Sequence, residues 1–214
     1  MHHQLIDACG LAGNRTGNRR QPALRALGGL LVGFIMLSAP LASADWRVSD
    51  GSSVHYVSIK NQTIAENNVF TEITGGITDT GSLSLAVDLA SVETKVDIRN
   101  QRMRDIFFDV ANFPNALVSA QLEALDLAQI DAGQAVERRV SLRLSLHGIV
   151  ATVDAYVRAV VVGDQLLVTT LEPVLIAAGD FGLAEGVSAL QKLAGLTGIA
   201  SAVPVTVNIQ FQKD

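Results

Sequence analysis

Few residues of this chain could take part in acid–base or metal chemistry. Beyond residue 44 the only histidines are His55 and His147. They do not have the H-x-x-x-H spacing that would bring two imidazole rings to one metal on a helix. The only cysteine, Cys9, lies near the start of the chain. The sequence therefore predicts neither a catalytic nor a structural metal site.

Paired carboxylates are a second source of chemistry. Asp105 and Asp109 are four residues apart and could share one side of a helix. Arg102 and Arg104 stand beside them, and such a mixture is more typical of a solvated charge cluster. The sequence also lacks a G-x-S-x-G elbow, a phosphate-binding G-x-x-x-x-G-K-[ST] loop and a dinucleotide fingerprint. We therefore predict no enzyme, and a hydrolase that uses either histidine is the weakest of three hypotheses.

These carboxylates belong to the segment DIRNQRMRDIFFDVANFP, residues 97–114. Its apolar residues recur at spacings of three and four, which predicts a short amphipathic helix. Asp97 is positioned to cap the helix start, and Pro114 prevents helix at the residue before it. We expect this helix to plug one end of a β structure. In a further interpretation, its aromatic residues Phe107, Phe108 and Phe113 line the mouth of a cavity.

Most of the remaining chain beyond residue 44 alternates between apolar and polar residues, the pattern of half-buried strands. The clearest stretches are 82–90, 116–125, 139–159 and 202–211, whereas 183–194 has a helical period and Gly195 is suited to cap its end. A loop is expected through 131–133. We also interpret the Gly75–Gly76 pair as a bulge or sharp bend that lets the sheet curl.

About eight alternating strands and two short helices predict a mainly β protein, a closed antiparallel barrel without exposed edges. A two-sheet sandwich has the same pattern and is the alternative. The apolar faces favour the barrel because alanine recurs on them, which suggests an under-filled interior. These alanines are Ala120, Ala124, Ala151, Ala155 and Ala159.

The start of the chain has the features of a secretory signal peptide. Four arginines precede an uncharged run at 26–44, which ends in the A-x-A motif of residues 42–44. The apolar part, 27–37, is shorter than the about 20 residues that span a bilayer, so a retained anchor is the second choice. We expect residues 1–44 to be an extension and signal peptide that is cleaved, and residues 45–214 to be one periplasmic or secreted domain.

The charge of that domain limits its partners. The chain has 16 Lys and Arg and 21 Asp and Glu residues, of which 1–44 hold four and one, so residues 45–214 carry a net charge of 12 − 20 = −8. Phosphate would repel so acidic a domain, which excludes nucleic acid as the expected partner. The expected partner is a hydrophobic small molecule or lipid. No stable membrane span is expected after cleavage. The sequence does not decide whether the domain forms a homodimer.

Several motifs together resemble the YceI-like family. They are S-x-V-x-[FY] at 52–56, RNQRMRDIFFDVANFP, SLHG, AAGDFGL and AVPV, and the resemblance covers nearly all of residues 45–214. The chain departs from commoner members at Ser58 and Asn61. The resemblance implies a lipocalin-like barrel that holds a long polyisoprenoid or similar lipid in an interior tunnel. No other cofactor is expected.

The leading hypothesis is therefore non-catalytic binding or carriage of an isoprenoid, quinone-like or other amphiphilic lipid. The alternative is a structural or stress-response periplasmic protein with a filled core. If the apolar strand faces point inward, we expect the ligand to contact aromatic and small apolar side chains. The candidates are Tyr56, Phe70, Phe107, Phe108, Phe113, Val153, Ala155, Val157 and Phe181.

Overall fold

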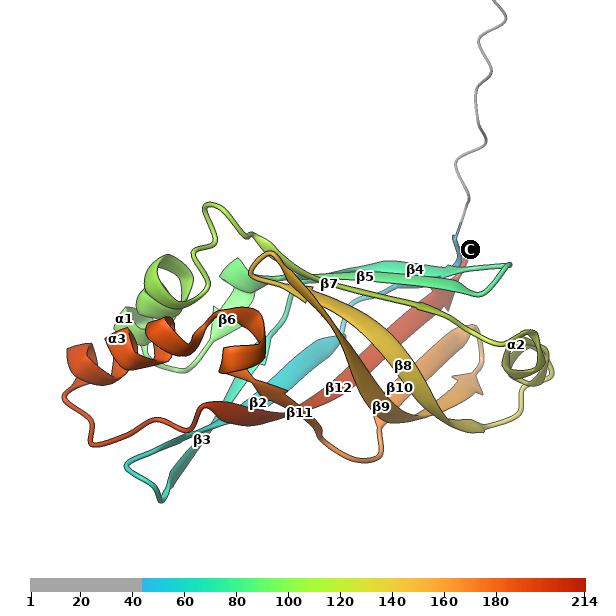
Figure 1. Cartoon of the computed structure of the whole chain (residues 1–214). Helices are drawn as coiled ribbons and strands as arrows, with labels where there is room; N and C mark the ends of the chain where they lie inside the picture. Colours follow the sequence, from blue (N-terminus) through green and yellow to red (C-terminus); the bar gives the residue numbers. More distant parts are fainter. Residues whose placement is uncertain (1–43) are drawn as a thin grey trace, which may run out of the picture. The chain divides into compact units, whose positions relative to one another are not determined.

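The structure is a computed structural model that describes residues 44–214. The predicted leader lies outside these residues except for Ala44. Figure 1 shows strands wound around a common interior, with helices near both ends. The strands are β1 (Ala44–Val48), β2 (Ser53–Lys60), β3 (Ile64–Phe70), β4 (Ile73–Thr78), β5 (Ser82–Asp88), β6 (Val92–Glu93), β7 (Asn115–Gln121), β8 (Val136–Leu146), β9 (Ile149–Val162), β10 (Gln165–Thr170), β11 (Val174–Ala177) and β12 (Ala202–Lys213). The helices are η1 (Leu89–Ser91), α1 (Asp97–Arg102), η2 (Met103–Phe107), α2 (Ala124–Asp131), η3 (Ala178–Phe181) and α3 (Ala184–Ala194).

Eight of the strands close into an antiparallel barrel. Their order is β1-β4-β5-β7-β8-β9-β10-β12, and β12 pairs back onto β1 through Trp46 and Lys213. This closing pair confirms the predicted barrel and excludes the two-sheet alternative. Strands β2, β3, β6 and β11 lie outside the ring.

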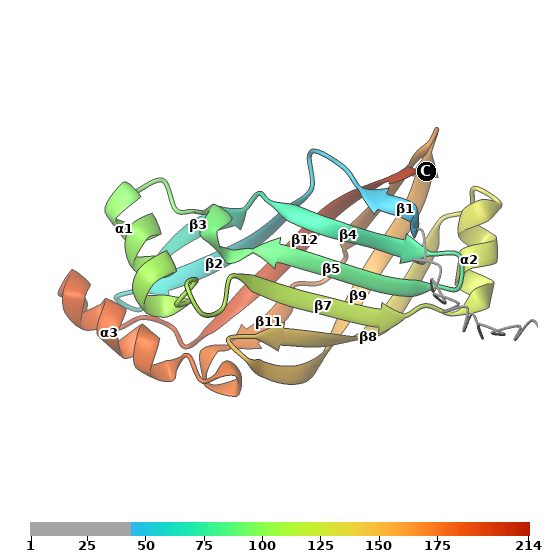
Figure 2. The ribbon, with the colours of Figure 1, turned by 90° about the horizontal axis from the view of Figure 1, so that it is seen from above.

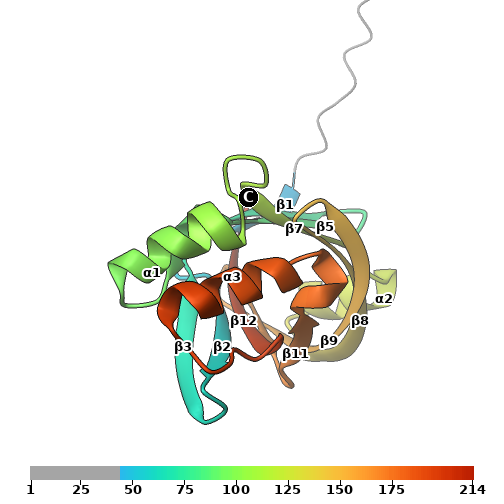
Figure 3. The same ribbon diagram turned by 60° about the vertical axis from the view of Figure 1, so that its left-hand side comes forward.

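Strand β12 joins the ring to the additional strands because it is twelve residues long. Its residues 208–212 pair with β10, whereas 205–208 pair with β2 and 202–205 with β11. The wall therefore continues past the closed ring on one side. Figure 3 looks at that end of the molecule, where α1 and α3 lie across the opening.

The helix predicted within 97–114 forms at 97–107, and its hydrogen-bonding pattern changes along its length. Residues 97–102 are α-helical and 103–107 are a π-helical turn, in which the Phe108 amide donates to the Met103 carbonyl. The expected cap is wrong: Val96 occupies the capping position and no side chain caps the helix. Instead, buried Asn100 accepts from the amide and hydroxyl of Thr94, at 2.8 and 2.6 Å, and so fixes the first turn.

Helix α2 was not predicted. The alternation of 116–125 was interpreted as strand throughout, but β7 ends at Gln121 and Ala124 already belongs to the helix. Asp126 of α2 is buried and accepts from Arg138 of β8 at 2.7 Å. This ion pair and buried Ile130 hold α2 against the barrel end that lies away from α1 and α3 (Figure 2).

Helix α3 confirms its prediction, with Gly195 in the left-handed conformation at its end. None of the helices within 44–214 is long and apolar enough to cross a membrane.

The bend expected at Gly75–Gly76 takes a different form. Strands β4 and β5 pair without a register shift, and the irregularity lies on β1 between Ala44 and Trp46. Gly75 nevertheless has a φ of +127°, a conformation that is accessible to glycine and strained for other residues. Gly75 thus marks a close approach of β4 to the main chain of β5.

Candidate ligand-binding cavity

A cavity of about 650 Å³ opens into the interior between the strands and helices α1 and α3. This volume is in the range of small-molecule sites in proteins. Strands β2, β3, β8, β11 and β12 supply much of the wall, and α1, η2 and α3 close over it. Most lining side chains are aliphatic or aromatic, so the cavity can bind an apolar molecule.

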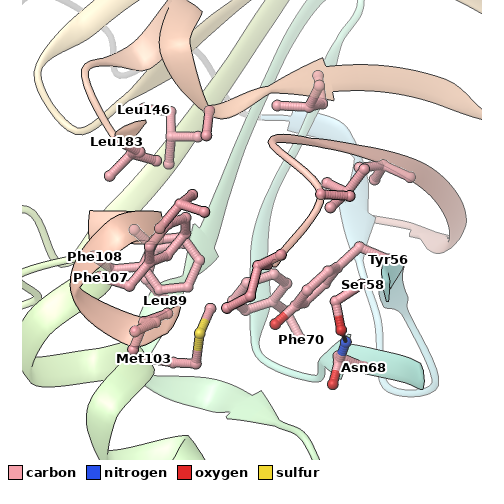
Figure 4. A pocket seen from close by; sticks show the side chains of 18 of the residues that line it. Tyr56, Ser58, Asn68, Phe70, Leu89, Met103, Phe107, Phe108, Leu146 and Leu183 are labelled. Atoms are coloured by element: carbon pink, nitrogen blue, oxygen red, sulfur yellow. Dashed lines mark hydrogen bonds between the residues drawn. The ribbon is translucent and has the colours of Figure 1, made fainter. Parts of the chain in front are cut away.

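An aromatic cluster forms one side of the cavity (Figure 4). Tyr56 of β2 stacks on Phe70 of β3 with ring centroids 5.6 Å apart. Phe70 meets the edge of Phe108 at 5.7 Å, and Phe108 meets Phe107 at 4.8 Å. Aromatic side chains from the π-helical turn and from the β2–β3 hairpin therefore pack together as one wall of the cavity.

A second, smaller cavity of about 170 Å³ lies deeper in the barrel. Ala155, Val157 and Ala159 of β9 contribute to its wall, as do Asp126 and Ile130 of α2. Six side chains line both cavities, so the two are neighbouring compartments of one interior: Val54, Val87, Val118, Leu142, Val174 and Val207.

Five of the nine predicted contact residues line the larger cavity: Tyr56, Phe70, Phe107, Phe108 and Val153. Ala155 and Val157 line only the smaller one. Their role in binding a ligand stays a prediction.

The structure places the other two aromatic residues elsewhere. Phe113 packs on the β8–β9 turn, with its ring centroid 4.4 Å from that of His147. Phe181 is only 1% exposed and fills the core beside η3, while Ala178 and Leu183 of the same segment line the cavity. We therefore correct the expectation that Phe113 and Phe181 form its wall.

Helix α3 contributes to the cavity wall, which the sequence did not predict. Its apolar side faces the larger cavity through Val187, Leu190 and Ala194. The spacing of these residues predicted an apolar face, but did not tell whether that face covers other side chains or an open space.

The under-filled interior has a different origin from the one expected. Of the five alanines singled out, only Ala155 and Ala159 line a cavity, the smaller one. Ala124 is exposed on α2. The larger cavity is walled mainly by large side chains, and residues of α1 and α3 contribute to that wall at the barrel mouth.

The groups considered for catalysis lie away from both cavities. His55 is exposed on β2, and its ring is 3.1 Å from the Ser53 hydroxyl. Asp109 follows the end of the helix with a positive φ and accepts from Asn112, so it does not share a helical face with Asp105. Within 44–214 no cluster of three metal-ligating side chains forms.

Three of the four charged residues that line the cavity, Lys60, Glu66 and Arg99, are paired with one another, and the fourth, Arg102, donates to the Leu193 carbonyl at 3.5 Å. Glu66 of β3 accepts from Lys60 of β2 and from Arg99 of α1, both at 2.8 Å. Burial alone would raise the pKa of Glu66, but Lys60 and Arg99 outweigh it and hold that pKa below its ordinary value. This carboxylate thus fastens α1 to the β2–β3 hairpin.

Replacing Glu66 with Gln tests this fastening. A carboxyl with a lowered folded-state pKa stabilises the fold above its unfolded pKa of about 4.3, and this contribution disappears as the pH falls through the folded pKa. We expect Glu66→Gln to lower the free energy of unfolding by about 0.5–1 kcal/mol at about pH 7, and by much less at about pH 3. Urea unfolding at both pH values measures this difference.

Glu172→Gln is the matched control because the ion pair between Glu172 and Arg139 is exposed at 3.2 Å. It should change stability little at either pH. An equal loss for Glu66→Gln at both pH values would contradict the role of its charge.

A closed antiparallel barrel around an apolar cavity defines a lipocalin-like class of protein. Within that class, the model of the YceI-like domain matches residues 46–211, and the chain belongs to the YceI-like family. This confirms the resemblance that the motifs indicated.

Two solved structures illustrate the likeness. A polyisoprenoid binding domain from Saccharophagus degradans, implicated in plant cell wall breakdown, is 30% identical, with a TM-score of 0.76 over 80% of this chain and 100% of that one. BcnA from Burkholderia cenocepacia is 18% identical, with a TM-score of 0.57 over 74% of this chain and 95% of BcnA, and it supports the fold alone. No curated protein matches the chain.

Proposed function

We propose that this protein binds or carries a long-chain amphiphilic lipid, such as an isoprenoid or a quinone-like molecule, without catalysing a reaction. The observation that carries the proposal is the apolar cavity of about 650 Å³ inside the closed barrel, next to a second compartment. The polyisoprenoid binding domain at 30% identity supports the same ligand class. Neither His55 nor His147 lines a cavity, which favours binding over hydrolysis.

The energetics of such a complex need no charged anchor. Burial of about ten CH₂ groups at ~0.8 kcal/mol each contributes about 8 kcal/mol, which corresponds to micromolar affinity before ordering costs. A structural protein with a filled core, the alternative, has no use for a cavity of this size. The leader motif supports a periplasmic or secreted location for the carrier.

We expect the protein to co-purify with a lipid. Native mass spectrometry of gently purified material should give a mass above that of the polypeptide, and solvent extraction should release an amphiphile that accounts for the difference. Delipidated protein should take up added polyisoprenoid. Failure to retain or take up any amphiphile would contradict the proposal and favour the structural alternative.

A further inference from the structure

Three uncharged polar side chains of the β2–β3 hairpin interrupt the apolar wall of the larger cavity. Tyr56 and Ser58 of β2 and Asn68 of β3 all line it, and Figure 4 shows them side by side. Tyr56 stands directly opposite Asn68 in the β2–β3 register, which places both on one face of the hairpin. An apolar cavity with a few convergent polar groups is the usual form of a site that recognises a specific molecule.

The orientation of the Asn68 amide follows from its partners. Its Nδ2 donates to the main-chain carbonyl oxygen of Glu66 at 3.2 Å and to Ser58 Oγ at 3.1 Å. A carbonyl oxygen can only accept, so the amide nitrogen must face it. Ser58 Oγ therefore accepts, and among the described residues its own hydrogen has no acceptor.

The same side chain carries an unsatisfied atom. Asn68 is 3% exposed, and its Oδ1 has no hydrogen-bond partner within the described part of the chain. Buried polar atoms are nearly always paired, and this oxygen can only accept, so of the uncharged oxygen groups only an alcohol could donate to it.

Tyr56 supplies a second free donor. Its hydroxyl takes part in none of the hydrogen bonds between described side chains, although Phe70 holds its ring in place. Burial raises the pKa of this phenol and Arg99 lowers it only in part, so the hydroxyl keeps its proton. The cavity wall thus offers two O–H groups, on Tyr56 and Ser58, at alternate positions of one strand.

The charges that flank these side chains, Lys60, Glu66 and Arg99, are already paired with one another, which favours an uncharged partner for the hydroxyls; Arg102, the fourth charged residue in the wall, donates to the Leu193 carbonyl at 3.5 Å. Glu66 occupies the inward position next to Asn68 along β3, and it already engages both Lys60 and Arg99. An anionic head group would meet this carboxylate and would have to compete for its two cations.

We propose that Tyr56, Ser58 and Asn68 form a head-group subsite that binds an uncharged oxygen acceptor, such as a carbonyl, ether or alcohol oxygen, of an amphiphile. The two hydroxyls donate to this oxygen, and Asn68 holds Ser58 in position. The apolar chain of the ligand then extends along the aromatic wall and the aliphatic side chains. This subsite deepens the proposed function and rests on it.

A matched pair of probes tests the subsite: a long-chain methyl ketone and the alkane of the same chain length. Both are measured by displacement of an environment-sensitive fluorescent probe from delipidated protein. We expect the wild type to prefer the ketone. Tyr56→Phe and Ser58→Ala should each weaken ketone binding about three- to ten-fold, the effect of one lost hydrogen bond, and leave alkane binding within about two-fold.

Tyr156→Phe is the matched control because it removes the hydroxyl of the other tyrosine. That hydroxyl donates to Glu137 at 3.2 Å on the exposed face of the β8–β9 pair. The control should bind both probes as the wild type does. Thermal melting of all variants ensures that the comparison is made between folded proteins.

The outcomes separate the subsite from the proposed function. Equal binding of ketone and alkane by the wild type, or unchanged ketone binding by Tyr56→Phe and Ser58→Ala, would overturn the subsite and leave lipid binding intact. A fatty acid of equal chain length that binds more tightly than the ketone would overturn its preference for uncharged groups. If neither ketone nor alkane binds, the proposed function itself fails.

Discussion

Val153→Phe is expected to abolish lipid retention and to leave the melting temperature close to that of the wild type. Val153 of β9 pairs with Leu142 of β8, and both side chains line the larger cavity. Val153 is only half-buried because open space lies in front of it. A phenyl ring would occupy that space, exclude the ligand chain and cause little overpacking. Native mass spectrometry and thermal melting of the same sample measure both effects.

Ala155→Phe is the comparison for this experiment. Ala155 is 2% exposed and faces the smaller compartment of about 170 Å³. A phenyl ring there should overpack the interior at a cost of about 1–3 kcal/mol. The melting temperature should fall by about 2–4 °C for each kcal/mol. A Val153→Phe protein that retains lipid would show that the larger cavity is not the binding site, and one that melts as low as Ala155→Phe would show that no open space lies in front of Val153.

Gly75→Ala is expected to cause the largest loss of stability of any substitution considered for this protein. A Cβ atom at this position would lie 2.0 Å from the Ser84 carbonyl oxygen and 2.9 Å from Leu85 Cα, both main-chain atoms of β5. The main chain cannot move away without opening the β4–β5 pair, and the φ of +127° adds backbone strain. We expect a loss of more than about 3 kcal/mol in the free energy of unfolding, measured by urea denaturation.

Gly179→Ala is the control for that substitution. Gly179 is exposed in η3, its φ is not in the left-handed region, and an added Cβ would have no atom within 4 Å. Its stability should stay within about 0.5 kcal/mol of the wild type. A similar small effect for Gly75→Ala would mean that β4 and β5 can separate at little cost.

The strands were predictable because each has one face toward the interior and one toward solvent. In β8, Val140, Leu142 and Leu144 alternate with polar residues, and they pair with Ala155, Val153 and Ala151 of β9, which alternate in the same way. Helix α2 was not predicted because the apolar–polar alternation of β7 continues by chance as far as Ala124. The strand has ended before that residue, and Ala124 is the first residue of the helix.

The site was only partly predictable, for a physical reason. Periodicity assigns a side chain to a face of its own strand or helix, but it does not tell what that face meets across the interior. Ala155 and Val153 alternate with polar residues on the same strand, yet they line different compartments. Phe181 is aromatic, as a wall residue would be, but it lies in the packed core. After the turn at η3 it is Leu183 that faces the cavity.

The pairing of β1 with β12 has a practical consequence for handling the protein. Trp46 lies opposite Lys213, so the first described strand begins close to where the last one ends. Figure 2 places Asp214 toward the end that carries α2, away from the opening beneath α1 and α3. A surface tether or a fused reporter attached at Asp214 would therefore hold the barrel with its opening directed outward. Ligand exchange could then be followed on immobilised protein without obstructing the entrance.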